Sequence, residues 1–119
     1  MVELLDELRL LIVEDDNVFR NSLVKILEKK NFSVHSVAGI MDAQTRLELI
    51  HYDLVISDVN LPDGNGLTLY ENNCDLPFVL MSSTRLEISL KANYKLFFIE
   101  KPFQIENLLD CISIAIKVD

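Results

Sequence analysis

The stretch Leu54-Val55-Ile56-Ser57-Asp58 carries a short apolar run directly into a carboxylate. Runs of this kind, rich in β-branched residues and a few residues long, are typical of strands buried in a parallel sheet. Similar runs occur at residues 8–13, 33–37, 78–81 and 96–99. The chain therefore predicts five strands, and the third, over residues 54–57, is followed directly by the reactive side chain of Asp58.

The segments between these runs have apolar residues three or four positions apart, which is the spacing of an amphipathic helix. The pattern predicts long helices over residues 17–30, 40–50 and 105–117, and short ones over 67–72 and 85–92. Strands that alternate with helices indicate an α/β fold with a parallel sheet covered on both faces. Because crossovers between parallel strands are right-handed, few topologies are possible. A flavodoxin-like, doubly wound sheet with strand order 2-1-3-4-5 is one of them, and it places the first strand beside the third.

Composition and charge restrict the function. The chain has 119 residues, half of them hydrophobic, which predicts one domain over residues 1–119. Its net charge of −8 argues against direct nucleic-acid binding, which needs clustered Lys and Arg. No apolar run is long enough for a bilayer, so no membrane contact is expected. The acidic segment 1–7 lacks the pattern of a signal peptide, so the expected location is cytoplasmic.

Reactive side chains stand at or just after the carboxyl ends of four predicted strands. They are Asp15 and Asp16, Asp58, Ser82 and Lys101. The carboxyl ends of parallel strands share one edge of the sheet, and open α/β sheets bind ligands there. Three carboxylates, a hydroxyl and an ammonium in one crevice suggest a magnesium ion and a phosphoryl group carried by an aspartate.

A divalent cation would relieve the repulsion between the three carboxylates. Mg²⁺ prefers one or two carboxylates together with waters and phosphate oxygens. We expect Asp16 as a direct ligand, Asp15 as a direct or water-mediated ligand, and oxygens from Asp58 and the Asn60 backbone carbonyl. The alternative for Asp15 and Asp16 is capping of the helix 17–30, and the two interpretations are compatible.

Asp58 is the candidate nucleophile, since a carboxylate oxygen can attack phosphorus to give an acyl phosphate. Phosphoryl transfer depends mainly on positioning and charge neutralisation, which Lys101 and the hydroxyl of Ser82 would supply. The alternatives are a helix cap for Ser82 and an ordinary surface lysine for Lys101. A cis bond before Pro102 would aim the lysine back over the crevice.

Three segments resemble the receiver domain of bacterial two-component response regulators: Leu11-Ile12-Val13-Glu14-Asp15-Asp16, the stretch from Asp58 to Gly66, and Lys101-Pro102-Phe103. The resemblance covers nearly the whole chain and implies the same strand order. It implies that Asp58 is the phosphoacceptor and that Asp15 and Asp16 are the acidic pair for Mg²⁺. It also implies that Ser82 and Phe98 form the switch pair. The phosphodonor in such families is a histidine of a sensor kinase or phosphotransfer protein.

The resemblance further implies a population shift on phosphorylation, which changes a surface formed by residues 85–92, 96–99 and 105–117. The short helices at 67–72 and 85–92 depart from the family pattern, and Asn93 replaces a small Gly-Ala turn. Extra apolar residues on the last helix, Cys111, Ile114 and Val118, predict either a wide core-facing side or a homodimer contact on that surface.

Other functions remain open on the sequence. An aspartate-nucleophile phosphatase would need an acid two residues after Asp58, and Asn60 stands there. A receiver-like scaffold that works without phosphorylation is the second alternative, although the complete set of acids, hydroxyl and lysine argues against it. A flavin-binding protein would need a Ser/Thr-rich phosphate loop after the first strand, whereas this chain has Asp15 and Asp16 there, which would repel a phosphate. We expect no enzymatic activity beyond phosphorylation and dephosphorylation of Asp58.

Overall fold

The computed structural model describes residues 8–83 and 95–117. Its strands are β1 (Arg9–Val13), β2 (Ser33–Val37), β3 (Leu54–Asp58), β4 (Asn60–Leu61), β5 (Gly64–Asn65), β6 (Phe78–Ser82) and β7 (Leu96–Glu100). Its helices are α1 (Asn17–Lys29), α2 (Ile40–Leu49), α3 (Gly66–Glu71) and α4 (Ile105–Ala115). Within these ranges, no helix combines the length and the apolar character that spanning a membrane requires.

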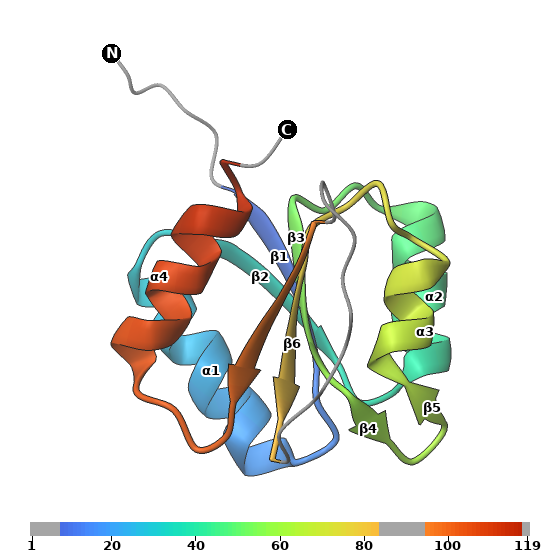
Figure 1. Cartoon of the computed structure of the whole chain (residues 1–119), viewed down its shortest axis with the longest axis horizontal. Helices are drawn as coiled ribbons and strands as arrows, with labels where there is room; N and C mark the ends of the chain where they lie inside the picture. Colours follow the sequence, from blue (N-terminus) through green and yellow to red (C-terminus); the bar gives the residue numbers. More distant parts are fainter. Residues whose placement is uncertain (1–7, 84–94, 118–119) are drawn as a thin grey trace.

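Five parallel strands form one sheet in the order β2-β1-β3-β6-β7, with α1 and α4 on one side and α2 and α3 on the other (Figure 1). The first strand pairs with the third, as Leu10 opposite Leu54 illustrates. The predicted order 2-1-3-4-5 and the doubly wound α/β class are therefore confirmed.

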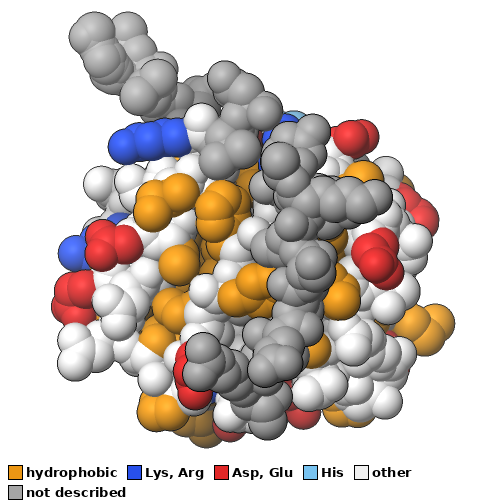
Figure 2. All heavy atoms as spheres, viewed as in Figure 1, with side chains coloured by type: hydrophobic (Ala, Val, Ile, Leu, Met, Phe, Trp, Pro, Cys, Tyr) orange, Lys and Arg blue, Asp and Glu red, His pale blue; other side chains and the backbone are white. Residues whose placement is uncertain are grey.

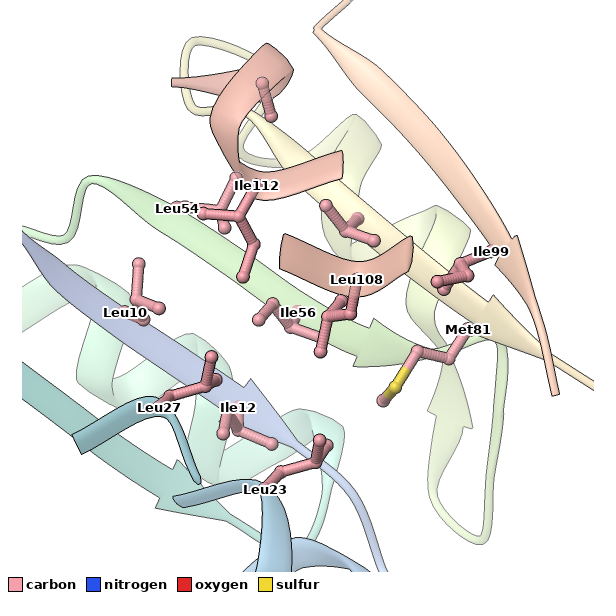
Figure 3. Packing of buried hydrophobic residues seen from close by; sticks show 12 residues of the cluster. Leu10, Ile12, Leu23, Leu27, Leu54, Ile56, Met81, Ile99, Leu108 and Ile112 are labelled. Atoms are coloured by element: carbon pink, nitrogen blue, oxygen red, sulfur yellow. The ribbon is translucent and has the colours of Figure 1, made fainter. Parts of the chain in front are cut away.

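Two apolar layers cover the faces of the sheet because successive strand residues point to opposite sides. Figure 3 shows the layer beneath α1 and α4, where Leu23 and Leu27 of α1 and Leu108 of α4 meet the strands. Alternate strand residues pack under α2 and α3, around the buried Tyr52. Burial on both faces explains why the strands read as continuous apolar runs rather than as alternating ones.

The five strand predictions were accurate to within one residue at every end. Three strands extend one residue further than predicted, so Asp58, Ser82 and Glu100 are their last residues. The predicted helix at 85–92 and its end at Asn93 lie outside the described residues. The small antiparallel hairpin of β4 and β5 was not predicted, since two-residue strands have no periodicity to detect.

Candidate functional site

Lys101 and Asp58 meet at the carboxyl edge of the sheet. Asp58 ends the central strand β3 and is 6% exposed. Lys101 follows β7, its bond to Pro102 is cis, and its amide donates to the Ser82 carbonyl at 2.7 Å. The Lys101 Nζ lies 2.7 Å from Oδ1 of Asp58. The ammonium therefore points into the crevice, as expected from the sequence.

Glu14 belongs to the site, although it was not among the site residues predicted from the sequence. It follows β1, is 1% exposed, and its Oε1 accepts a hydrogen bond from the Lys101 Nζ at 2.7 Å. Among the described residues, carboxylate oxygens of Glu14, Asp15 and Asp58 lie within 4.8 Å of one another. This group has the oxygen chemistry of a magnesium site and includes two of the three acids expected there.

Asp16 lies outside this acidic cluster. Its Oδ1 accepts hydrogen bonds from the backbone amides of Val18 at 3.0 Å and Phe19 at 3.1 Å, so it is the N-cap of α1. The amide of Asp16 also donates to Oε2 of Glu14 at 3.0 Å. The carboxylates that gather beside Asp58 are thus those of Glu14 and Asp15, whereas the expected pair was Asp15 and Asp16. The sequence did contain a signal for this difference: the helix was predicted to begin at Asn17, which makes Asp16 its N-cap residue.

The electrostatics of the crevice follow from its burial. Burial and the neighbouring Glu14 raise the pKa of Asp58 to about 7, although Lys101 opposes the shift. Burial also acts against ionisation of Glu14, but hydrogen bonds with Asp58, Lys101 and the Asp16 amide outweigh it, so the Glu14 pKa lies below its ordinary value. The pKa of Lys101 is raised, because the two carboxylates outweigh its desolvation. One ammonium does not balance three carboxylates, so a hard cation fits the site.

The Phe19 ring also lies against Lys101. Its Nζ lies 4.6 Å from the centre of the Phe19 ring, and Phe19 packs edge to face on Phe103. A cation over an aromatic face is attracted to the ring electrons. The adjoining open cleft has a volume of about 410 Å³ and is lined by Asp16, Phe19, Ser83, Lys101, Pro102 and Phe103.

The backbone after Asp58 is fixed by close packing at Gly66. A Cβ at Gly66 would overlap the carbonyl oxygen of Asp58 and lie 2.9 Å from the Ser57 Oγ. The Gly66 amide donates to the carbonyl of Val59 at 2.8 Å, and α3 begins at Gly66, one residue before the predicted start. The backbone at Gly66 therefore packs directly against the backbone of the candidate nucleophile Asp58.

The other expected residues lie around this crevice. Ser82 is the buried last residue of β6 and is paired in register with Glu100, next to Lys101. Phe98 is half-buried in β7 and packs against the apolar layer under α2 and α3. Asn60 is exposed at the start of β4, two residues after Asp58. The switch roles of Ser82 and Phe98 and the metal role of the Asn60 carbonyl stay predictions.

Comparison with known proteins gives a consistent result. A family model described as the response regulator receiver domain matches residues 10–113. The regulatory protein VirG of Agrobacterium tumefaciens is 31% identical over 116 residues, which cover 91% of this chain and 43% of VirG. The chain thus spans less than half the length of this relative.

Solved structures share the fold. The non-phosphorylated receiver domain of HemR from Leptospira biflexa is 29% identical, with a TM-score of 0.81 over 95% of this chain and 97% of that one. The response regulator TrrA from Thermotoga maritima, solved with Mg²⁺ and BeF, has a TM-score of 0.79. It covers 91% of this chain and 98% of its own at 20% identity, so this likeness concerns the fold alone.

Proposed function

Because this chain belongs to the response regulator receiver domain family, we propose that Asp58 is its phosphoacceptor and that Lys101 stabilises the phosphorylated state. One observation carries the proposal: Lys101 Nζ lies 2.7 Å from Asp58 Oδ1 at the sheet edge where Glu14 and Asp15 also gather. A buried carboxylate beside a fixed ammonium suits a reaction that depends on positioning and charge neutralisation.

Receiver domains bind Mg²⁺ at an acidic cluster. In this chain we assign that role to Glu14, Asp15 and Asp58, with the Asn60 carbonyl as a further oxygen. The donor set fits, since all three are carboxylates and hard cations prefer oxygen ligands. When bound, Mg²⁺ supplies positive charge against the oxygens of the transferring phosphoryl group.

The chemistry on the protein side is a displacement at phosphorus. A carboxylate oxygen of Asp58 attacks, a new P–O bond forms, and the bond from phosphorus to the donor nitrogen breaks. The leaving imidazole keeps the electron pair of that bond, and the product is a mixed anhydride on Asp58. Attack requires the ionised carboxylate, and contact with Lys101 favours that form. The ammonium then remains beside the added phosphoryl oxygens.

Receiver domains work with histidine kinases or phosphotransfer proteins, and we propose a phosphohistidine of such a protein as the donor. The chemistry of this domain is then limited to phosphorylation and dephosphorylation of its own Asp58. A single receiver domain over residues 1–119 and a cytoplasmic location stay predictions. Partners and activity of any longer protein that contains this domain are likewise proposals.

The output surface is proposed around β7 and α4, together with residues 85–92, which lie outside the described ranges. Figure 2 shows hydrophobic side chains over α4 and β7 on the viewed face. Ile114 of α4 is 57% exposed, and Cys111 and Phe98 are half-buried. We propose that phosphorylation moves Ser82 and Phe98 and thereby alters this surface, including its use as a homodimer contact.

The other functions considered from the sequence are not favoured. The comparisons match receiver domains rather than phosphatases or flavoproteins. A scaffold that works without phosphorylation would have no need to keep Asp58, Glu14 and Lys101 within hydrogen-bonding distance.

The deciding experiment is incubation with Mg²⁺ and acetyl phosphate, followed by intact-mass measurement. We expect one phosphoryl group per chain, absent in Asp58→Asn and absent when EDTA replaces Mg²⁺. The exposed Asp75→Asn is the matched control and should behave as wild type. Full modification of the Asp58→Asn protein would refute the site assignment.

A further inference from the structure

Asp63 joins the loop after the phosphoacceptor to the start of α2. Its Oδ1 accepts a hydrogen bond from the Ile40 amide at 2.8 Å, and its Oδ2 accepts one from the Met41 amide at 3.0 Å. The N-cap residue of α2 is Gly39, which has no side chain to satisfy these amides. A carboxylate distant in sequence therefore does the work that a capping side chain usually does.

The contact is sterically matched on both sides. A Cβ at Gly39 would lie 2.9 Å from each carboxylate oxygen of Asp63, and a Cβ at Gly64 would lie 3.1 Å from Cγ1 of Ile40. The two amides also hold the pKa of Asp63 below its ordinary value, so the carboxylate is ionised at neutral pH. An anion at a helix amino terminus is further stabilised by the helix dipole.

Asp63 lies in the turn that joins β4 to β5. Figure 1 shows this hairpin near the carboxyl edge of the sheet. The base of the hairpin is fixed where the Gly66 amide binds the Val59 carbonyl at 2.8 Å. The tip is fixed by the two bonds from Asp63 to α2. Asn60, two residues after the phosphoacceptor, therefore lies on a segment held at both ends.

We propose that Asp63 is a positioning residue: by binding the first amides of α2 it holds the 60–65 hairpin in place and so sets the affinity of the adjoining acidic site for Mg²⁺. The inference rests on the proposed function of Asp58. Its physical basis is that a ligand oxygen on a fixed backbone loses little freedom when a cation binds, whereas one on a loose loop must first be ordered.

The test uses a graded series in the metal-free protein and then with Mg²⁺. Asp63→Ala removes both acceptors, Asp63→Asn keeps one oxygen, and Gly39→Ala crowds the same contact from the helix side. Asp42→Asn removes a charge from the first turn of α2 without touching the hairpin contact and is the matched control. Amide NMR signals of Ile40 and Met41 report directly whether the two bonds are lost.

We expect Asp63→Ala to weaken Mg²⁺ binding about ten-fold, the low end of what is lost when a residue that orients a metal ligand is removed. The Mg²⁺ affinity of Asp63→Asn should lie between the affinities of Asp63→Ala and wild type. Asp42→Asn should bind Mg²⁺ as tightly as wild type. Gly39→Ala should weaken binding in the same direction. The Gly39→Ala, Asp63→Ala double variant should be no worse than Asp63→Ala alone, since both act through one contact.

Two results would overturn the inference. If the Ile40 and Met41 signals change while the Mg²⁺ dissociation constant stays at the wild-type value, Asp63 merely caps a helix. If the losses of Mg²⁺ affinity caused by Gly39→Ala and Asp63→Ala add fully in the double variant, the two substitutions do not act through a shared contact. Neither result touches the phosphoacceptor assignment, whereas a wild-type protein that binds no Mg²⁺ would remove both proposals together.

Discussion

The ammonium of Lys101 donates a 2.7 Å hydrogen bond to the carboxylate of Glu14, across 87 positions of sequence. This bond ties the end of β7 to the end of β1, and the same ammonium reaches Asp58 at the end of β3. Three strand ends are thereby linked through one nitrogen. The site is assembled only when β1, β3 and β7 are all in place in the sheet.

Glu14→Gln tests the revised acidic pair against Asp16→Asn. We expect Glu14→Gln to weaken Mg²⁺ binding roughly ten-fold or more, since even residues that only orient a ligand cost about that much. Asp16→Asn should bind Mg²⁺ as wild type does, because Asn is an equally good helix cap. Isothermal titration of both variants gives the answer, and the opposite ranking would restore Asp16 as the ligand.

The unfolding free energy of the metal-free protein should depend on pH because Asp58 titrates differently in the folded and unfolded states. Its pKa is raised to about 7 in the fold, so between pH 4 and about 7 the folded state holds a proton that the unfolded state has released. This group therefore contributes a stability that is present at low pH and is lost as pH rises through 7. Asp58→Asn should remove that dependence and be more stable at pH 8 by about 1–3 kcal/mol.

Urea unfolding at several pH values in EDTA measures this difference, with Asp75→Asn as the control. If the unfolding free energies of Asp58→Asn and wild type changed with pH in parallel, the pKa of Asp58 would not be raised in the folded state. Added Mg²⁺ should stabilise wild type by about 2.7 kcal/mol at a hundred times the dissociation constant and leave Asp58→Asn nearly unchanged.

Gly66→Ala and Gly64→Ala form a pair that tests the packing behind the nucleophile. The Cβ of the first would overlap the Asp58 carbonyl oxygen, which the sheet holds rigidly, so we expect a loss of about 2–4 kcal/mol and impaired phosphorylation. The Cβ of the second meets side-chain atoms of Ile40 at 3.1 Å rather than a backbone atom, so its cost should be smaller. Equal unfolding free energies for the two variants would contradict this account.

His35 should make the fold sensitive to acid in the opposite sense to Asp58. Burial and the nearby Arg46 and Arg9 lower its pKa below the ordinary value, and its Nδ1 lies 2.6 Å from the hydroxyl of the buried Tyr52. The unfolded chain therefore takes up a proton first, and stability falls as pH drops below about 6.5. The effect should be at most about 0.5 kcal/mol, because the ring is partly screened by solvent.

The effect of His35 is best isolated by unfolding experiments in an Asp58→Asn background, which lacks the opposing titration. His35→Phe should flatten the pH dependence of the unfolding free energy between pH 5 and 7. A steeper loss of stability at low pH in His35→Phe than in its parent would contradict the assignment.

The strand order was predicted from the alternation of strands and helices together with the resemblance to receiver domains. The positions of Asp15, Asp58, Ser82 and Lys101 near strand ends were predicted because apolar runs are local signals. Asp58, Ser82 and Lys101 each stand at or directly after a strand end, and any parallel sheet brings such ends to one edge. Glu14 escaped notice because two consecutive aspartates offered a more obvious pair. Asp63 escaped because its partners belong to a helix far away in the sequence.

The amino-acid sequence by itself determined the elements, their alternation and the kind of chemistry available at the edge of the sheet, since periodicity and residue type are properties of short stretches. Only the tertiary structure decided which acids share the crevice. Glu14 and Asp16 are two residues apart with the same charge. One turns toward Lys101 and the other toward the amides of α1, because the geometry of the strand-to-helix junction gives each carboxylate a different partner. Such partners come from segments that meet only when the whole sheet has formed.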